Sequence, residues 1–64
     1  MNKETAIVEV RIELGNISNI ANNSLEELTV YTDKREFEKI VNLFMKQTFK
    51  SLSLIKKTIK NLKV

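Results

Sequence analysis

The hydrophobic residues follow two different periods along the chain. Residues 5–14, "TAIVEVRIEL", alternate between apolar and polar positions. The apolar set on one side of this segment is Ala6, Val8, Val10, Ile12 and Leu14. A period of two combined with several β-branched residues is typical of a half-buried β-strand. The pattern therefore predicts a first strand over residues 5–14.

Turn-forming residues separate this segment from the next apolar one. Gly15 is followed by "NISNIANNS", which is rich in Asn and Ser, residues that bond their own backbone and favour turns. We therefore expect a loop over residues 15–24. Residues 25–32, "LEELTVYT", resume the alternation and predict a second, shorter strand that is antiparallel to the first.

After residue 32 the period changes to that of a helix. Asp33 and Glu36 have the spacing of an N-terminal capping pair, and both charges suit the positive end of a helix dipole. The apolar positions that follow recur at spacings of three, four and seven. They are Val41, Phe44, Met45, Thr48, Leu52, Ile55, Ile59 and Leu62. This pattern predicts one amphipathic helix over residues 33–62.

Together these elements predict one α+β domain over residues 1–64, with two or three antiparallel strands followed by a long C-terminal helix. The helix would be about 45 Å long, whereas strands of this size reach about 27–34 Å and leave part of its apolar stripe uncovered. The chain has no Cys or His for a disulfide or a common zinc site. We therefore expect dimerisation, with a second copy or a related chain, to complete the fold.

Composition also bears on chemistry. The chain lacks His and Cys, and its single Gly leaves no glycine-rich phosphate loop. The paired carboxylates, Glu26 with Glu27 and Glu36 with Glu38, are one or two positions apart and do not face each other on a strand or a helix. We therefore expect a protein that is not an enzyme and that uses no cofactor or metal.

The charges are divided unequally along the chain. Residues 1–32 carry a net charge of −3 and residues 33–64 a net charge of +6. A basic half can attract nucleic acid, so a small dimeric DNA-binding regulator of mobile-element type, with a β-ribbon against DNA, is an alternative function. Glu9 and Glu13, on the exposed side of the first strand, argue against it because they would repel DNA phosphates.

The N-terminal segment does not have the form of a targeting signal. Charged residues interrupt its apolar positions, and the longest apolar runs anywhere in the chain are three residues. The absence of Cys fits a reducing compartment. We therefore expect a cytoplasmic protein with no membrane span.

One segment resembles a known family. Residues 33–47, "DKREFEKIVNLFMKQ", are similar to the C-terminal helix of the small dimerisation subunit of the KEOPS complex, in which an acidic residue ends a strand and an N-S-Y-L-R type of run follows. Asn42, Phe44, Met45 and Lys46 match positions of that run. The segment "AIVEVRIEL" looks like the first strand of the family.

The resemblance implies a non-catalytic subunit that supports threonylcarbamoyladenosine modification of tRNA. Such a subunit pairs with a related small subunit and docks on the transferase subunit. The loop over residues 15–24 is too short for the helix and strand that the family has there, which implies a shortened paralogue. The implied partner interface is Val8, Val10, Ile12, Phe37, Val41, Phe44, Met45, Leu52 and Ile55. The implied contacts to RNA phosphates are Lys56, Lys57, Lys60 and Lys63.

Overall fold

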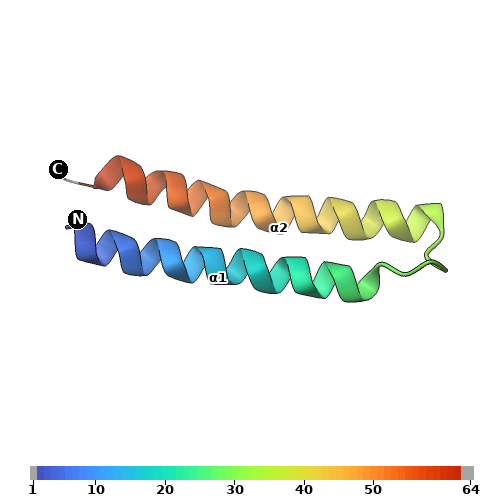
Figure 1. Ribbon diagram of the computed structural model, residues 1–64. Helices are drawn as coiled ribbons and strands as arrows, with labels where there is room; N and C mark the ends of the chain where they lie inside the picture. The colour runs from blue at the N-terminus through green and yellow to red at the C-terminus, as the bar shows by residue number, and fades with distance from the viewer. Residues whose placement is uncertain (1, 63–64) are drawn as a thin grey trace.

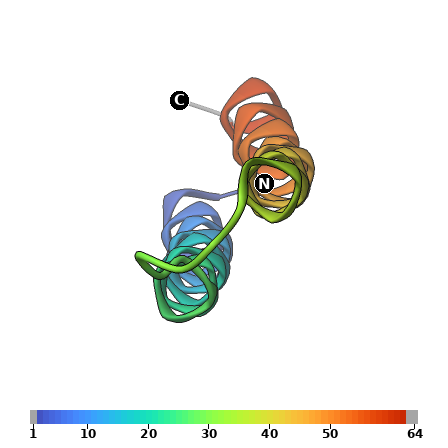
Figure 2. The same cartoon turned by 90° about the vertical axis from the view of Figure 1, so that its right-hand side faces the viewer.

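The computed structural model describes residues 2–62, and these residues form a hairpin of two long helices (Figure 1). Helix α1 spans Lys3–Glu27 and helix α2 spans Lys34–Asn61. The two helices run antiparallel side by side, so that both ends of the chain lie opposite the connecting loop (Figure 1). The molecule measures 49 × 15 × 9 Å along its principal axes, and the view along the helices shows a single layer (Figure 2).

The prediction of an α+β fold is therefore wrong. The described residues contain no strand: the segments expected as a strand (5–14) and a loop (15–24) both lie within α1. The expected second strand, 25–32, is divided between the last turn of α1 and the loop. Helix α2 is continuous and lies one residue inside each end of the helix expected over 33–62.

The reason is a second hydrophobic period that coexists with the alternation in the first half of the chain. Positions spaced by four and three residues turn toward α2 and are buried or half-buried. They are Ala6, Val10, Glu13, Ile17, Ile20 and Ser24. Val8 and Ile12, which the alternation places with Val10 on one side, are instead more than half exposed. The contact with α2 therefore selects the helical period over the alternating one.

Helix α2 supplies the matching half of this contact, which we call the seam. Its buried and half-buried positions are also spaced by three and four residues, as in a two-stranded coiled coil. They are Val41, Phe44, Thr48, Ser51, Ile55, Thr58 and Leu62.

The seam mixes apolar and polar positions. Its two buried polar side chains, Ser51 and Thr58, lie in the half toward the chain ends, where Ala6, Val10 and Ile55 are also buried or half-buried. Only Ala6, Ser51 and Thr58 are buried, and no side chain among residues 2–62 is fully buried. A hairpin with so small a core buries too little apolar surface to offset the conformational entropy that its two helices lose on folding.

Both helices begin at a polar cap. The Asn2 side chain accepts a hydrogen bond from the Thr5 amide at 2.8 Å. The Asp33 carboxylate accepts one from the Glu36 amide at 2.8 Å, which is the contact expected at the start of the second helix. Between the helices, a turn closed by the Thr32 amide and the Thr29 carbonyl (3.1 Å) reverses the chain.

Candidate interaction surface

Six large apolar side chains flank the seam on one side of the hairpin, and we call them the apolar face. They are Ile7, Leu14 and Leu25 of α1 and Met45, Leu52 and Ile59 of α2. Their exposed fractions range from 47% to 69%. Large apolar side chains gathered on one exposed surface are a common mark of a protein–protein contact.

A hollow near the loop shows that the two rows lie on the same side. It is lined by Ala21 and Leu25 of α1 and by Val41 and Phe44 of α2, among others. The other two α1 members of the apolar face precede Ala21 by 7 and 14 residues, and the α2 members follow Val41 by 4, 11 and 18. Each set therefore follows one line along its helix, and the apolar face extends from the loop toward the chain ends.

The opposite side of the seam is more polar. Two shallow grooves on that side are lined mainly by charged and amide side chains, with Ile12 and Leu54 as exposed apolar members. We call the following set the polar face: Glu9, Glu13, Asn16 and Asn23 of α1 with Lys50 and Lys57 of α2. The hairpin therefore has one mainly apolar and one mainly polar broad side.

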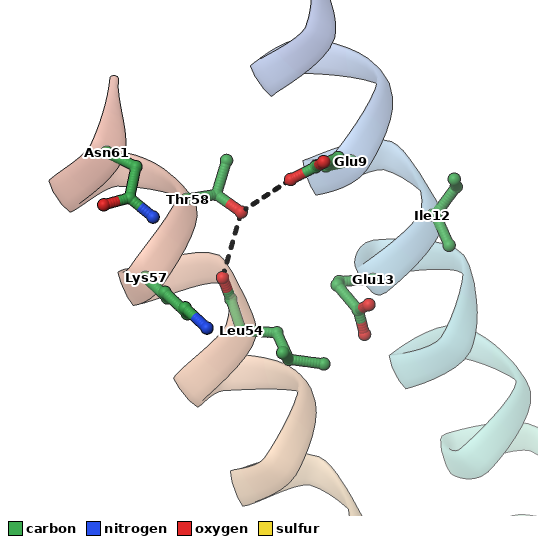
Figure 3. Close-up of a pocket in the computed structure, with 7 residues that line it drawn as sticks. All are labelled: Glu9, Ile12, Glu13, Leu54, Lys57, Thr58 and Asn61. Carbon is green, nitrogen blue, oxygen red and sulfur yellow. Dashed lines mark hydrogen bonds between the residues drawn. The ribbon is translucent and has the colours of Figure 1, made fainter. Parts of the chain in front are cut away.

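The groove nearest the chain ends contains a side-chain hydrogen bond between the helices (Figure 3). The Thr58 hydroxyl lies 3.2 Å from a carboxylate oxygen of Glu9 and 3.0 Å from the carbonyl oxygen of Leu54. Its single proton is shared between these two acceptors. On α1, the Asn16 amide donates to Glu13 at 3.3 Å. The Glu9–Thr58 hydrogen bond places position 9 of α1 beside position 58 of α2 and so sets the level at which the helices meet.

Among residues 2–62, no three Asp or Glu side chains lie close enough together to hold a metal ion. Neither helix is long and apolar enough to cross a membrane.

The structure divides the residues that were predicted to form a partner interface. Val10, Phe44 and Ile55 are half-buried in the seam. Met45 and Leu52 belong to the apolar face.

The remaining predicted interface residues lie at other places. Val41 borders both the seam and the apolar face. Phe37 is half exposed in the first turn of α2, and Val8 and Ile12 lie outside the seam on α1. The predicted interface is therefore not one surface, although its α2 part includes two of the three α2 members of the apolar face.

The described lysines predicted to contact RNA lie in the last two turns of α2, but not all on one face. Lys57 lines the groove that also holds Glu9 and Glu13. Lys56 and Lys60 are exposed on α2, and Lys63 lies outside the described residues.

The α1 row of the apolar face was missed by the sequence interpretation. Ile7, Leu14 and Ala21 are seven residues apart, which is a helical repeat. That spacing is the available signal, and the alternation over residues 5–14 competes with it.

Comparison of the chain with protein-family models, curated proteins and solved structures finds no match.

Proposed function

We propose that the protein is a non-catalytic assembly subunit that acts by packing its apolar face against another helical surface. The observation that carries this proposal is the apolar face itself. Covering apolar surface releases about 25 cal/mol per Å², and only three of the described residues are buried within the hairpin itself.

The proposal keeps the coarser part of the function expected from the sequence, that of an accessory subunit acting through protein contacts. Membership of the KEOPS complex stays a prediction. One of the two segments that support the resemblance, residues 5–14, was compared with a β-strand and is helical here. The alternative of a DNA-binding regulator with a β-ribbon relied on the same strand.

Photo-crosslinking in cells would test the proposed function. A photoreactive phenylalanine analogue replaces Leu52 on the apolar face or, as the control, Leu43. Leu52 and Leu43 are 50% and 52% exposed. They lie nine residues apart on α2, which at about 100° per residue places them on opposite sides of the helix.

A protein adduct that forms from position 52 and not from position 43 supports the proposal. Adducts of equal yield at both positions, or at neither, contradict it. Mass spectrometry of the adduct identifies the attached chain, which is either a second copy or a different protein.

A further inference from the structure

We propose that the partner on the apolar face is a second copy of this chain, and that two hairpins form a four-helix bundle with their loops at the same end. This inference rests on the proposed function and names the partner. Three observations support it: the surface area of the hairpin, the matched levels of the apolar rows, and the opposite charges of the helices.

The surface area is too large for a folded monomer. The hairpin exposes 5635 Å². A folded monomer of 7.4 kDa exposes about 4,200 Å² by the usual scaling with mass, about 1,400 Å² less. Each partner in a stable complex typically gives up about 800 Å². Contact with one copy of the same hairpin can therefore cover more than half of this excess.

Two residue pairs of the apolar face, those nearer the chain ends, occupy matched levels along the bundle axis. The Glu9–Thr58 hydrogen bond sets the level at one end. Counted from it, Leu14 of α1 lies near the level of Leu52 of α2, because one helix ascends as the other descends. By the same count, Ile7 lies near the level of Ile59.

A twofold axis parallel to the helices keeps every residue at its level and places α1 of one copy over α2 of the other. Leu14 then meets Leu52 of the second copy, and this pair occurs twice by symmetry. The apolar face is therefore self-complementary, which a twofold contact between identical chains requires.

Charge favours the same arrangement over the one with loops at opposite ends. Helix α1 carries five acidic and two basic side chains, a net charge of −3, and α2 carries two acidic and eight basic ones, a net charge of +6. The arrangement with loops at the same end places the acidic helix over the basic one. The other arrangement places α2 over α2 and would set two strongly basic helices against each other.

Sedimentation equilibrium of the purified chain tests the second copy. We expect a mass of about twice 7.4 kDa at micromolar concentration. Leu52→Lys should raise the dissociation constant at least about 100-fold, because each interface would bury two unpaired ammonium groups. The matched control, Leu43→Lys, should keep the wild-type mass.

Circular dichroism at several chain concentrations makes the result independent of whether the Leu52 variant folds. For a dimer, the wild-type melting temperature rises with concentration. A wild-type chain of monomer mass, with a melting temperature that does not depend on concentration, would overturn the proposal. A Leu52→Lys chain that dimerises as well as the Leu43→Lys control would overturn it too.

The relative orientation of the two hairpins can be tested by a distance measurement between their loops. The chain has no Cys, so Tyr31→Cys in the loop, at a position 93% exposed, gives a single site for a spin label. Loops at the same end bring the two labels much closer than the 49 Å length of the hairpin. An electron-spin distance near that length would overturn the arrangement.

These outcomes are separable from those of the proposed function. If position 52 forms a crosslink to a different protein and the purified chain is a monomer, the second copy is refuted while the assembly role stands. If neither position forms a selective crosslink, the proposed function fails whatever the mass of the purified chain.

Discussion

The two helices differ in how far each depends on packing against the other in order to be helical. Helix α1 contains the only Gly of the chain, four Asn and seven β-branched residues, all of which are weak helix formers. It also ends in Glu26 and Glu27, at the end of a helix where negative charge is unfavourable. Helix α2 has an acidic residue in its first turn and Lys60 in its last, and it is rich in Lys. Helix α2 therefore has most of the local signals of a helix, and α1 needs the seam.

Breaking α1 at its centre should have the largest effect. Gly15→Pro removes a helix hydrogen bond and introduces a clash in the middle of α1, at a cost of about 3 kcal/mol or more. We expect the chain to lose most of its helix signal by circular dichroism, including the part from α2. If only half of the signal were lost, α2 would be independent of α1. The control is Val30→Pro, which lies at the second position of the loop turn, where Pro is favoured.

The next largest effect on stability is expected at Thr48, a polar residue of the seam. The Thr48 hydroxyl is buried without a hydrogen-bond partner. Thr48→Val should therefore raise the free energy of unfolding by about 1 kcal/mol or more in urea titrations at fixed chain concentration. Thr58→Val is the matched control and should give no such gain, because its hydroxyl has two acceptors. Equal gains from both variants would mean that the Glu9 contact contributes nothing.

Removing each N-cap side chain in turn compares how much the two helix starts contribute to stability. Asp33→Ala should lower the free energy of unfolding by about 1 kcal/mol, because the Glu36 amide loses its acceptor. Asn2→Ala removes the equivalent contact to Thr5, but at a chain end, where fraying reduces the loss. Thermal melts of both variants would measure the difference. A larger loss at Asn2 would show that α1 depends on its own start more than on the seam.

The smallest expected effect is a gain in stability from a substitution at Gly15. A side chain added at Gly15 meets no other atom within 4 Å, and the residue does not have a positive φ. Gly15→Ala should therefore stabilise the chain by about 0.5–1 kcal/mol, through helix propensity alone. A rise in melting temperature without a change in sedimentation would support the interpretation that low helix propensity limits the stability of α1. A destabilised variant would contradict it.

The helix at 34–61 and the contact at Asp33 can be predicted from local signals in the sequence, namely the hydrophobic period and the capping residues. The apolar positions of α2 keep one period over its whole length, and nothing competes with it. Residues 5–14 carry two periods at once, because Ala6 and Val10 belong both to the alternating set and to the four-and-three set. Only the presence of α2 decides between them. Gly15 and the asparagines after it add to the signal for a strand followed by a loop, since they favour turns when no neighbouring helix holds them in a helix.

The candidate site follows the same division. Met45 and Leu52 could be identified from the stripe of α2, whereas Ile7, Leu14 and Leu25 join the apolar face only once α1 is known to be a helix antiparallel to α2. Which part of the α2 stripe remains exposed depends on the direction from which α1 approaches, and the pattern of one helix does not contain that information.

The lengths of chain between facing residues of the seam bear on the order of folding. Near the loop, Ser24 and Phe44 line one hollow and only a short chain segment separates them, whereas the Glu9–Thr58 hydrogen bond closes a segment of 49 residues. Short closures cost less chain entropy and form sooner. The hairpin should zip from its loop and open from its chain ends, so hydrogen exchange should be slowest at the amides around Ile20 and Phe44.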